Sequence, residues 1–124
     1  MGESGMFLAM MQGSRRAYEY FKEKMAVWLP QNITVVVMPG NYWCCEKVIL
    51  GHLAAALCNQ PRKNRKLIIE CSENENKYQA DQVENQDIVI FTGMVSEIKK
   101  YKNEAENLLK LGANSVAVYA LAQQ

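Results

Sequence analysis

The chain has 124 residues, of which 49% are hydrophobic and 22% charged, and its formal net charge is +1. This length predicts one domain with a real core, and the near-neutral charge argues against nucleic acid as a partner. No apolar run approaches the roughly 20 residues of a membrane-spanning helix, and the N-terminus lacks the basic start of a secretory signal. We therefore expect a cytoplasmic protein with no membrane partner.

The first predicted element is an amphipathic helix. A single domain is expected over residues 1–124, with residues 1–13 as a flexible N-terminal segment. Over residues 14–29, apolar side chains recur every three or four positions with charged residues between them, which predicts a helix. The apolar face consists of Tyr18, Phe21, Met25 and Trp28. We expect this whole face, Trp28 included, to pack on the core.

Two strands and a buried helix are predicted next. Residues 33–38 are β-branched and apolar on both faces, which is typical of an interior parallel strand. Proline and glycine end this strand, and residues 45–58 then show the wide apolar stripe of a mostly buried helix. The apolar run at residues 67–69 predicts a short strand near a sheet edge.

Two groups of side chains between these elements have a structural and a functional interpretation. The basic run Arg62-Lys63-Asn64-Arg65-Lys66 is interpreted as a solvated loop, with a phosphate-binding patch as the alternative. The four cysteines, which lack C-x-x-C spacing, are expected to be reduced and buried rather than zinc ligands; they are Cys44, Cys45, Cys58 and Cys71. A redox pair at Cys44-Cys45 is the alternative.

The C-terminal half completes an α/β pattern. Residues 72–86 are polar and predict a long mobile loop, and residues 87–91 predict a buried strand that ends at Thr92-Gly93. Residues 97–111 predict a helix with Gly112 at its C′ position, and residues 115–121 a final strand. The expected fold is a single three-layer α/β domain with a short, mostly parallel four-stranded sheet and helices on both faces.

In such a sheet, ligands bind beyond the carboxyl ends of the strands. Two strand-to-helix turns lie there, and their amides and helix dipoles could hold a phosphate, although turn geometry alone also explains one glycine in each. The candidate ligand-binding residues are Pro39, Gly40, Asn41, Tyr42, Thr92, Gly93, Met94, Val95 and Ser96. We expect the two turns to converge on one pocket, with Tyr42 and Trp43 available to stack on a base.

The segment DIVIFTGMVSEIKKYKNEAENLLKLGANSVAVYALAQQ resembles the end of a phosphoribosyltransferase domain of the competence ComF type. In that family an apolar strand enters the phosphoribosyl-diphosphate loop, a helix follows, and a GA-x-x-V-x-V-x-x-LA strand closes the chain. Upstream, ITVVVMPGNYWCCEKVILGHLAAAL resembles the family's first strand, loop and helix. The resemblance covers roughly residues 30–122 and implies a Rossmann-like fold and transferase chemistry.

The sequence departs from this family at its catalytic loop. The family's two adjacent acidic residues, which hold the ribose hydroxyls and help to place magnesium, fall near Thr92-Gly93. Its Thr-Thr-Gly phosphate cradle falls near Ser96-Glu97-Ile98. The departure implies that a phosphorylated small molecule binds while transferase activity is weak or absent, and that Mg²⁺ enters only with a diphosphate ligand.

Other functions are left open by the sequence. DIVIFTGMVSE also resembles the strand and turn of a sugar-isomerase phosphosugar-binding domain, and a non-catalytic interaction subunit is a third alternative. Self-association is compatible with each of them. His52 lies in the middle of a predicted helix, so a structural or surface role is expected for it rather than general-base chemistry.

Overall fold

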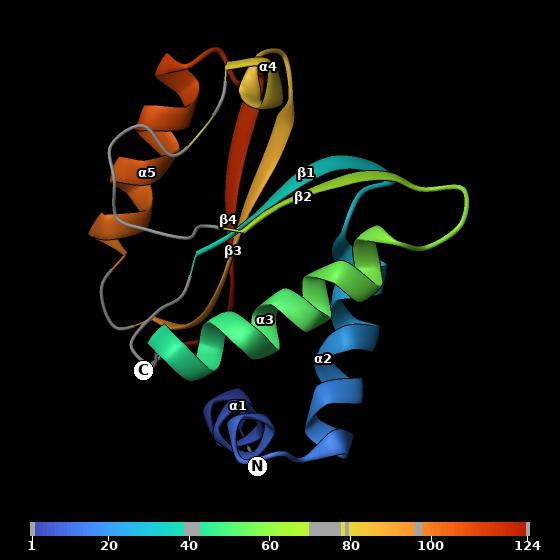
Figure 1. The fold of residues 1–124 in the computed structure, drawn as a ribbon. Coiled ribbons are helices and arrows are strands. Elements are labelled where there is room, and N and C mark those ends of the chain that lie inside the picture. The colour runs from blue at the N-terminus through green and yellow to red at the C-terminus, as the bar shows by residue number, and fades with distance from the viewer. Residues whose placement is uncertain (1, 39–42, 70–77, 79, 96–97, 124) are drawn as a thin grey trace.

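The computed structural model describes residues 2–38, 43–69, 78, 80–95 and 98–123 (Figure 1). Helices and strands alternate along most of the described chain. In order they are α1 (Glu3–Met11), α2 (Arg15–Trp28), β1 (Asn32–Val37), α3 (Trp43–Cys58), β2 (Asn64–Ile69), α4 (Ala80–Val83), β3 (Asp87–Val95), α5 (Lys99–Lys110) and β4 (Ser115–Gln123).

The four strands form one sheet in the order β2-β1-β3-β4, and every pairing is parallel. Helices α1, α2 and α3 cover one face, and α4 and α5 cover the other (Figure 1). The predicted three-layer α/β class is therefore confirmed. The prediction that the second strand lies at an edge is also confirmed, although β2 has six residues rather than three.

Alternation along the strands divides the core into two parts. Because successive side chains of a strand point to opposite faces, Val35 and Val37 pack toward α1–α3, whereas Val36 packs toward α5. Strand β3 follows the same rule with Phe91 on the first face and Ile90 on the second. These interior strands are buried on both faces, which explains why their sequences read as continuous apolar runs.

Three expectations about the helices need correction. Residues 1–13, expected to be flexible, contain α1, which is held by the burial of Phe7 and Met10. Trp28 is not part of the buried core: it is 43% exposed at the end of α2 and stacks on Tyr119 with ring centroids 4.4 Å apart. Part of the expected loop at residues 72–86 is the short helix α4, anchored by the buried Val83; residues 72–77 and 79 lie outside the described part.

The basic run at residues 62–66 is not simply a solvated loop, because Arg65 lies in β2 and is only 8% exposed. Its guanidinium donates to the carbonyl oxygens of Leu29, Pro30 and Leu57, each at 2.8 Å. A fourth bond reaches the Gln60 side chain at 3.0 Å. Since Leu29 caps α2 and Leu57 lies in the last turn of α3, one buried cation satisfies carbonyls at the negative ends of two helices.

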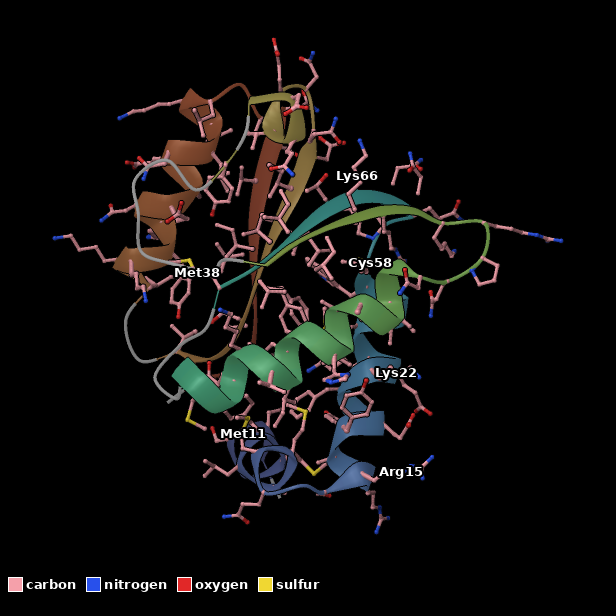
Figure 2. All side chains as sticks on the ribbon, viewed as in Figure 1. Met11, Arg15, Lys22, Met38, Cys58 and Lys66 are labelled. Atoms are coloured by element: carbon pink, nitrogen blue, oxygen red, sulfur yellow. The ribbon has the colours of Figure 1, made fainter. Side chains whose placement is uncertain are left out.

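The cysteine that the structure describes in detail behaves as expected. Cys58 is a free, buried thiol that donates to the Lys66 carbonyl at 3.8 Å; both residues are labelled in Figure 2. Burial raises the pKa of the Cys58 thiol, and the nearby Arg65 charge opposes this effect. Cys71 lies outside the described residues, and the side chains of Cys44 and Cys45 are not described.

Phe21 is completely buried in the core between α2 and the sheet. We expect Phe21→Ala to lower the free energy of unfolding by about 3 kcal/mol or more, because it removes a large apolar contact and leaves a cavity. Urea unfolding followed by circular dichroism measures the change. Leu109→Ala, which truncates a side chain that is 48% exposed, is the control and should stay within about 0.5 kcal/mol. Equal effects of the two variants would contradict this packing.

We expect Arg65→Met to lower the free energy of unfolding by about 3 kcal/mol or more, because three backbone carbonyls lose their donor together. Arg65→Lys should be intermediate, since an ammonium keeps the charge but not the fork of donors. The exposed Lys66 on the same strand supplies the control, Lys66→Met, which should be nearly neutral. Arg65→Met and Lys66→Met of equal stability would refute the role of the guanidinium.

Candidate functional site

The carboxyl ends of β1 and β3 lie side by side. Val37 pairs with Phe91, and the Met38 amide donates to the Phe91 carbonyl at 2.9 Å, so both strands run toward the same edge of the sheet. Helices α3 and α5 begin at this edge (Figure 1). Residues 39–42 and Ser96 lie outside the described part of the chain, so convergence of the two turns on one pocket stays a prediction.

The expectation that β3 ends at Phe91 is wrong. The strand continues to Val95, because Thr92 pairs with Ala120 and Met94 with Ala122 of β4. This additional pairing keeps the backbone extended at Thr92-Gly93, where the dipeptide had suggested a turn. The predicted site residues from Thr92 to Val95 are therefore strand residues, and Met94 is only 3% exposed.

Thr92 is completely buried on the face covered by α5. Its hydroxyl donates to the Tyr101 hydroxyl at 3.1 Å, and Tyr101 itself is 3% exposed. The side chain at position 92 therefore contacts the protein's own helix rather than an open turn. Position 92 is thus inside the core.

Gly93 occupies the opposite face, under α1 and α3. A Cβ at this position would lie 2.7 Å from Cζ of Phe7 and 2.8 Å from Oε2 of Glu46, closer than side chains tolerate. Phe7 and Glu46 are both completely buried. The space beside Gly93 is therefore filled by a ring from α1 and an acidic side chain from the first turn of α3, which leaves no room for a larger residue.

Val95 is the predicted residue that reaches a cavity. With Ile98, Tyr101 and residues 118–122, it lines an open groove of about 1350 Å³ along β4. His52 lies elsewhere: it is exposed on α3 and lines a cavity of about 340 Å³ with Ser14 and Tyr18, away from the carboxyl edge, in agreement with a surface role. Trp43 begins α3, but its side chain is not described.

The described residues contain neither a cluster of metal-ligand side chains nor a helix of membrane-spanning length. In that part of the chain, no three side chains of the usual ligand types come together as a metal site would require. The Thr92 hydroxyl is engaged with Tyr101 and Gly93 has no side chain, so these positions do not fit the placing of magnesium by adjacent carboxylates. None of the helices in the described ranges is long and apolar enough to span a bilayer.

Sequence reasoning missed three residues that define this site. Phe7 lies in the apolar stretch from Met6 to Met11, which was too short and too uniformly apolar to show a helical period. Glu46 is a single acid at the start of a predicted apolar helix. An acid at that position was a signal that its side chain either caps the helix or fills a buried space. Tyr101 lies within the helix predicted at residues 97–111, but its contact with Thr92 depends on the unexpected length of β3.

Comparison with known proteins identifies the fold. No family model matches the sequence, and no curated protein resembles it closely enough to match. Among solved structures, the chain is similar to the HGPRT-ase of Leishmania tarentolae, solved in complex with GMP (TM-score 0.56, 14% identity, 98% of this chain and 68% of that one). It is also similar to the hypoxanthine phosphoribosyltransferase of Trypanosoma cruzi (TM-score 0.50, 12% identity, 98% of this chain and 78% of that one). The chain has a phosphoribosyltransferase-like fold.

Gly93→Ala tests the crowding beneath β3. We expect it to lower the free energy of unfolding by about 1–3 kcal/mol, because Phe7 and Glu46 must both shift to admit a methyl group. The control is Gly2→Ala, where a Cβ meets nothing within 4 Å. Thermal unfolding of both variants measures the difference. A Gly93→Ala protein as stable as Gly2→Ala would show that the space is open.

Proposed function

We propose that this chain is a divergent phosphoribosyltransferase-like domain of the competence ComF type that binds a phosphorylated small molecule but does not transfer phosphoribosyl groups. The observation that carries the proposal is the burial of both positions where the family's acids fall, Thr92 beneath α5 and Gly93 beneath α1. The fold likeness to two phosphoribosyltransferases supports the framework.

The loss of the acids affects catalysis more than binding. An oxocarbenium-like transition state and a magnesium-bound diphosphate both require nearby negative charge, and neither Thr92 nor Gly93 supplies it. Substitution with acids would not restore the site, because a carboxylate at position 93 would have to displace Phe7 and lose its hydration. Magnesium belongs to this proposal only as a companion of a diphosphate ligand.

Phosphate binding requires fewer chemical groups than catalysis does. The start of α5 follows the carboxyl end of β3, and its first turn carries the exposed Lys99 and Lys100. A phosphate dianion there would gain from the helix dipole, from backbone amides at the start of the helix and from two cations. The start of α3 is less suitable, because Glu46 already places a carboxylate in its first turn. We therefore assign the phosphate to the β3–α5 turn, which includes the predicted residue Ser96.

For catalysis, purified protein is incubated with phosphoribosyl diphosphate, magnesium and a panel of purine and pyrimidine bases, and pyrophosphate release is followed. We expect none above background. Release that depends on both magnesium and a base would contradict the non-catalytic assignment.

For binding, inorganic phosphate, ribose 5-phosphate and a hexose phosphate are titrated by NMR, with the amides of residues 98–100 as reporters. We expect shifts at millimolar ligand that weaken in Lys99→Gln/Lys100→Gln and persist in Lys110→Gln, which removes a cation from the other end of α5. Preference for the hexose phosphate would favour the phosphosugar-binding alternative. Unmoved reporter amides at all three ligands would contradict binding at this turn.

A further inference from the structure

Strand β4 is a long sheet edge without the usual protection. Among the described residues its one strand neighbour is β3, and its pairing with β3 runs from Ser115 to Gln123. Its sequence SVAVYALAQ contains no charged residue and no proline, which are the devices that normally prevent edge strands from pairing with other chains. The opposite edge differs, since β2 carries the exposed Lys66.

Exposed apolar side chains lie on both sides of this edge, together with the polar residues Glu3, Ser4 and Lys24. The groove of about 1350 Å³ follows residues 118–122 of β4, with Val27 and Trp28 of α2 on one side and Ile98 on the other. Val27 is 91% exposed, Ile98 52% and Trp28 43%. Exposed apolar side chains on both sides of an unpaired strand edge are typical of a surface that another strand covers.

We propose that β4 pairs antiparallel with β4 of a second copy of this chain, so that two four-stranded sheets join into one across a two-fold axis. This inference is independent of the proposed function, because it uses the outer backbone edge of β4 and not the β3–α5 turn. A symmetric register centred on Tyr119 sets Val118 opposite Ala120 of the second copy and Ala117 opposite its Leu121. Strand β4 contains no charged side chain, so this pairing neither brings like charges together nor buries a charge of the strand.

The charged groups beside the edge favour a second copy over an unrelated partner. Lys24 donates to Glu3 at 2.7 Å, and both are close enough to Tyr119 to act on the pKa of its phenol, which burial raises. Each Lys24–Glu3 pair is neutral as a whole, so neither copy brings an unbalanced charge to a contact centred on Tyr119. The groove is thus charge-balanced and self-complementary.

The size of the contact is sufficient. Two paired strands of nine residues form about eight to ten inter-strand hydrogen bonds, which is within the usual number for a stable protein interface. The pairing would also cover Val27 and Ile98 with their symmetry mates. Hydrogen bonding along the edge and apolar burial at its sides therefore act together.

Sedimentation of the full chain over a micromolar concentration range tests the proposal. We expect a reversible species of twice the 14.1 kDa chain mass. Val27→Lys and Ala117→Lys, both at exposed positions beside the β4 edge, should weaken the dimer at least tenfold. Val48→Lys, a matched change at a 61% exposed residue of α3, should leave it unchanged. A chain that stays monomeric throughout, or a dimer equally strong in all variants, would overturn the proposal.

Hydrogen exchange identifies the contacting edge directly. If β4 pairs with itself, alternate amides of residues 115–123 should exchange more slowly as the protein concentration rises, while the amides of β2 should not change. A dimeric sample in which β4 exchange is independent of concentration would refute pairing through this strand, whatever its mass. Protection of the β2 amides, rather than the β4 amides, that rises with protein concentration would also refute pairing through β4.

Discussion

The Arg65 guanidinium connects the ends of two helices to the sheet, and the placement of α2 and α3 over the sheet depends on it. It donates to Leu29 and Pro30 after α2 and to Leu57 in the last turn of α3, while its own backbone belongs to β2. All of these acceptors are neutral oxygens at helix ends, where the negative ends of two dipoles balance the buried charge. A lysine has one point of attachment and could not reach all of them.

This junction lies at the amino ends of the strands, opposite the candidate site. Asp87 marks the same end on β3, where its carboxylate accepts hydrogen bonds from Asn114 and Ser115 and fixes the start of β4. These bonds also lower the pKa of the Asp87 carboxyl. Polar side-chain contacts at the amino ends of the strands thus join β2 to the ends of α2 and α3 and β3 to the start of β4.

The spacing of hydrophobic residues along the sequence was sufficient to predict the four strands, their parallel arrangement and the helices α2, α3 and α5. Each of those elements buries one or two faces. This spacing failed as a guide where a contact joins residues that are far apart in the sequence. Arg65 belonged to a run of basic residues that looked solvated, and the carbonyl of Leu29 that binds it lies 36 positions away. The end of β3 was misplaced for the same reason, since the Thr-Gly dipeptide is a local turn signal and the pairing of Thr92 with Ala120 is not local.

The true length of β3 also decides where positions 92 and 93 lie within the phosphoribosyltransferase-like fold. Lengthening β3 moves positions 92 and 93 from the edge into the ladder, and the strand's alternation sends one side chain toward Tyr101 and the other toward Phe7. Both directions lead into packed core, where Tyr101 is the partner of the Thr92 hydroxyl and where the side chains of Phe7 and Glu46 already fill the space beside Gly93. Helix α1 determines this arrangement, because its Phe7 is buried in the core on that face of the sheet and excludes any side chain at position 93. At this point of the sheet, the packing of Phe7 and Glu46 leaves no space for a side chain at position 93.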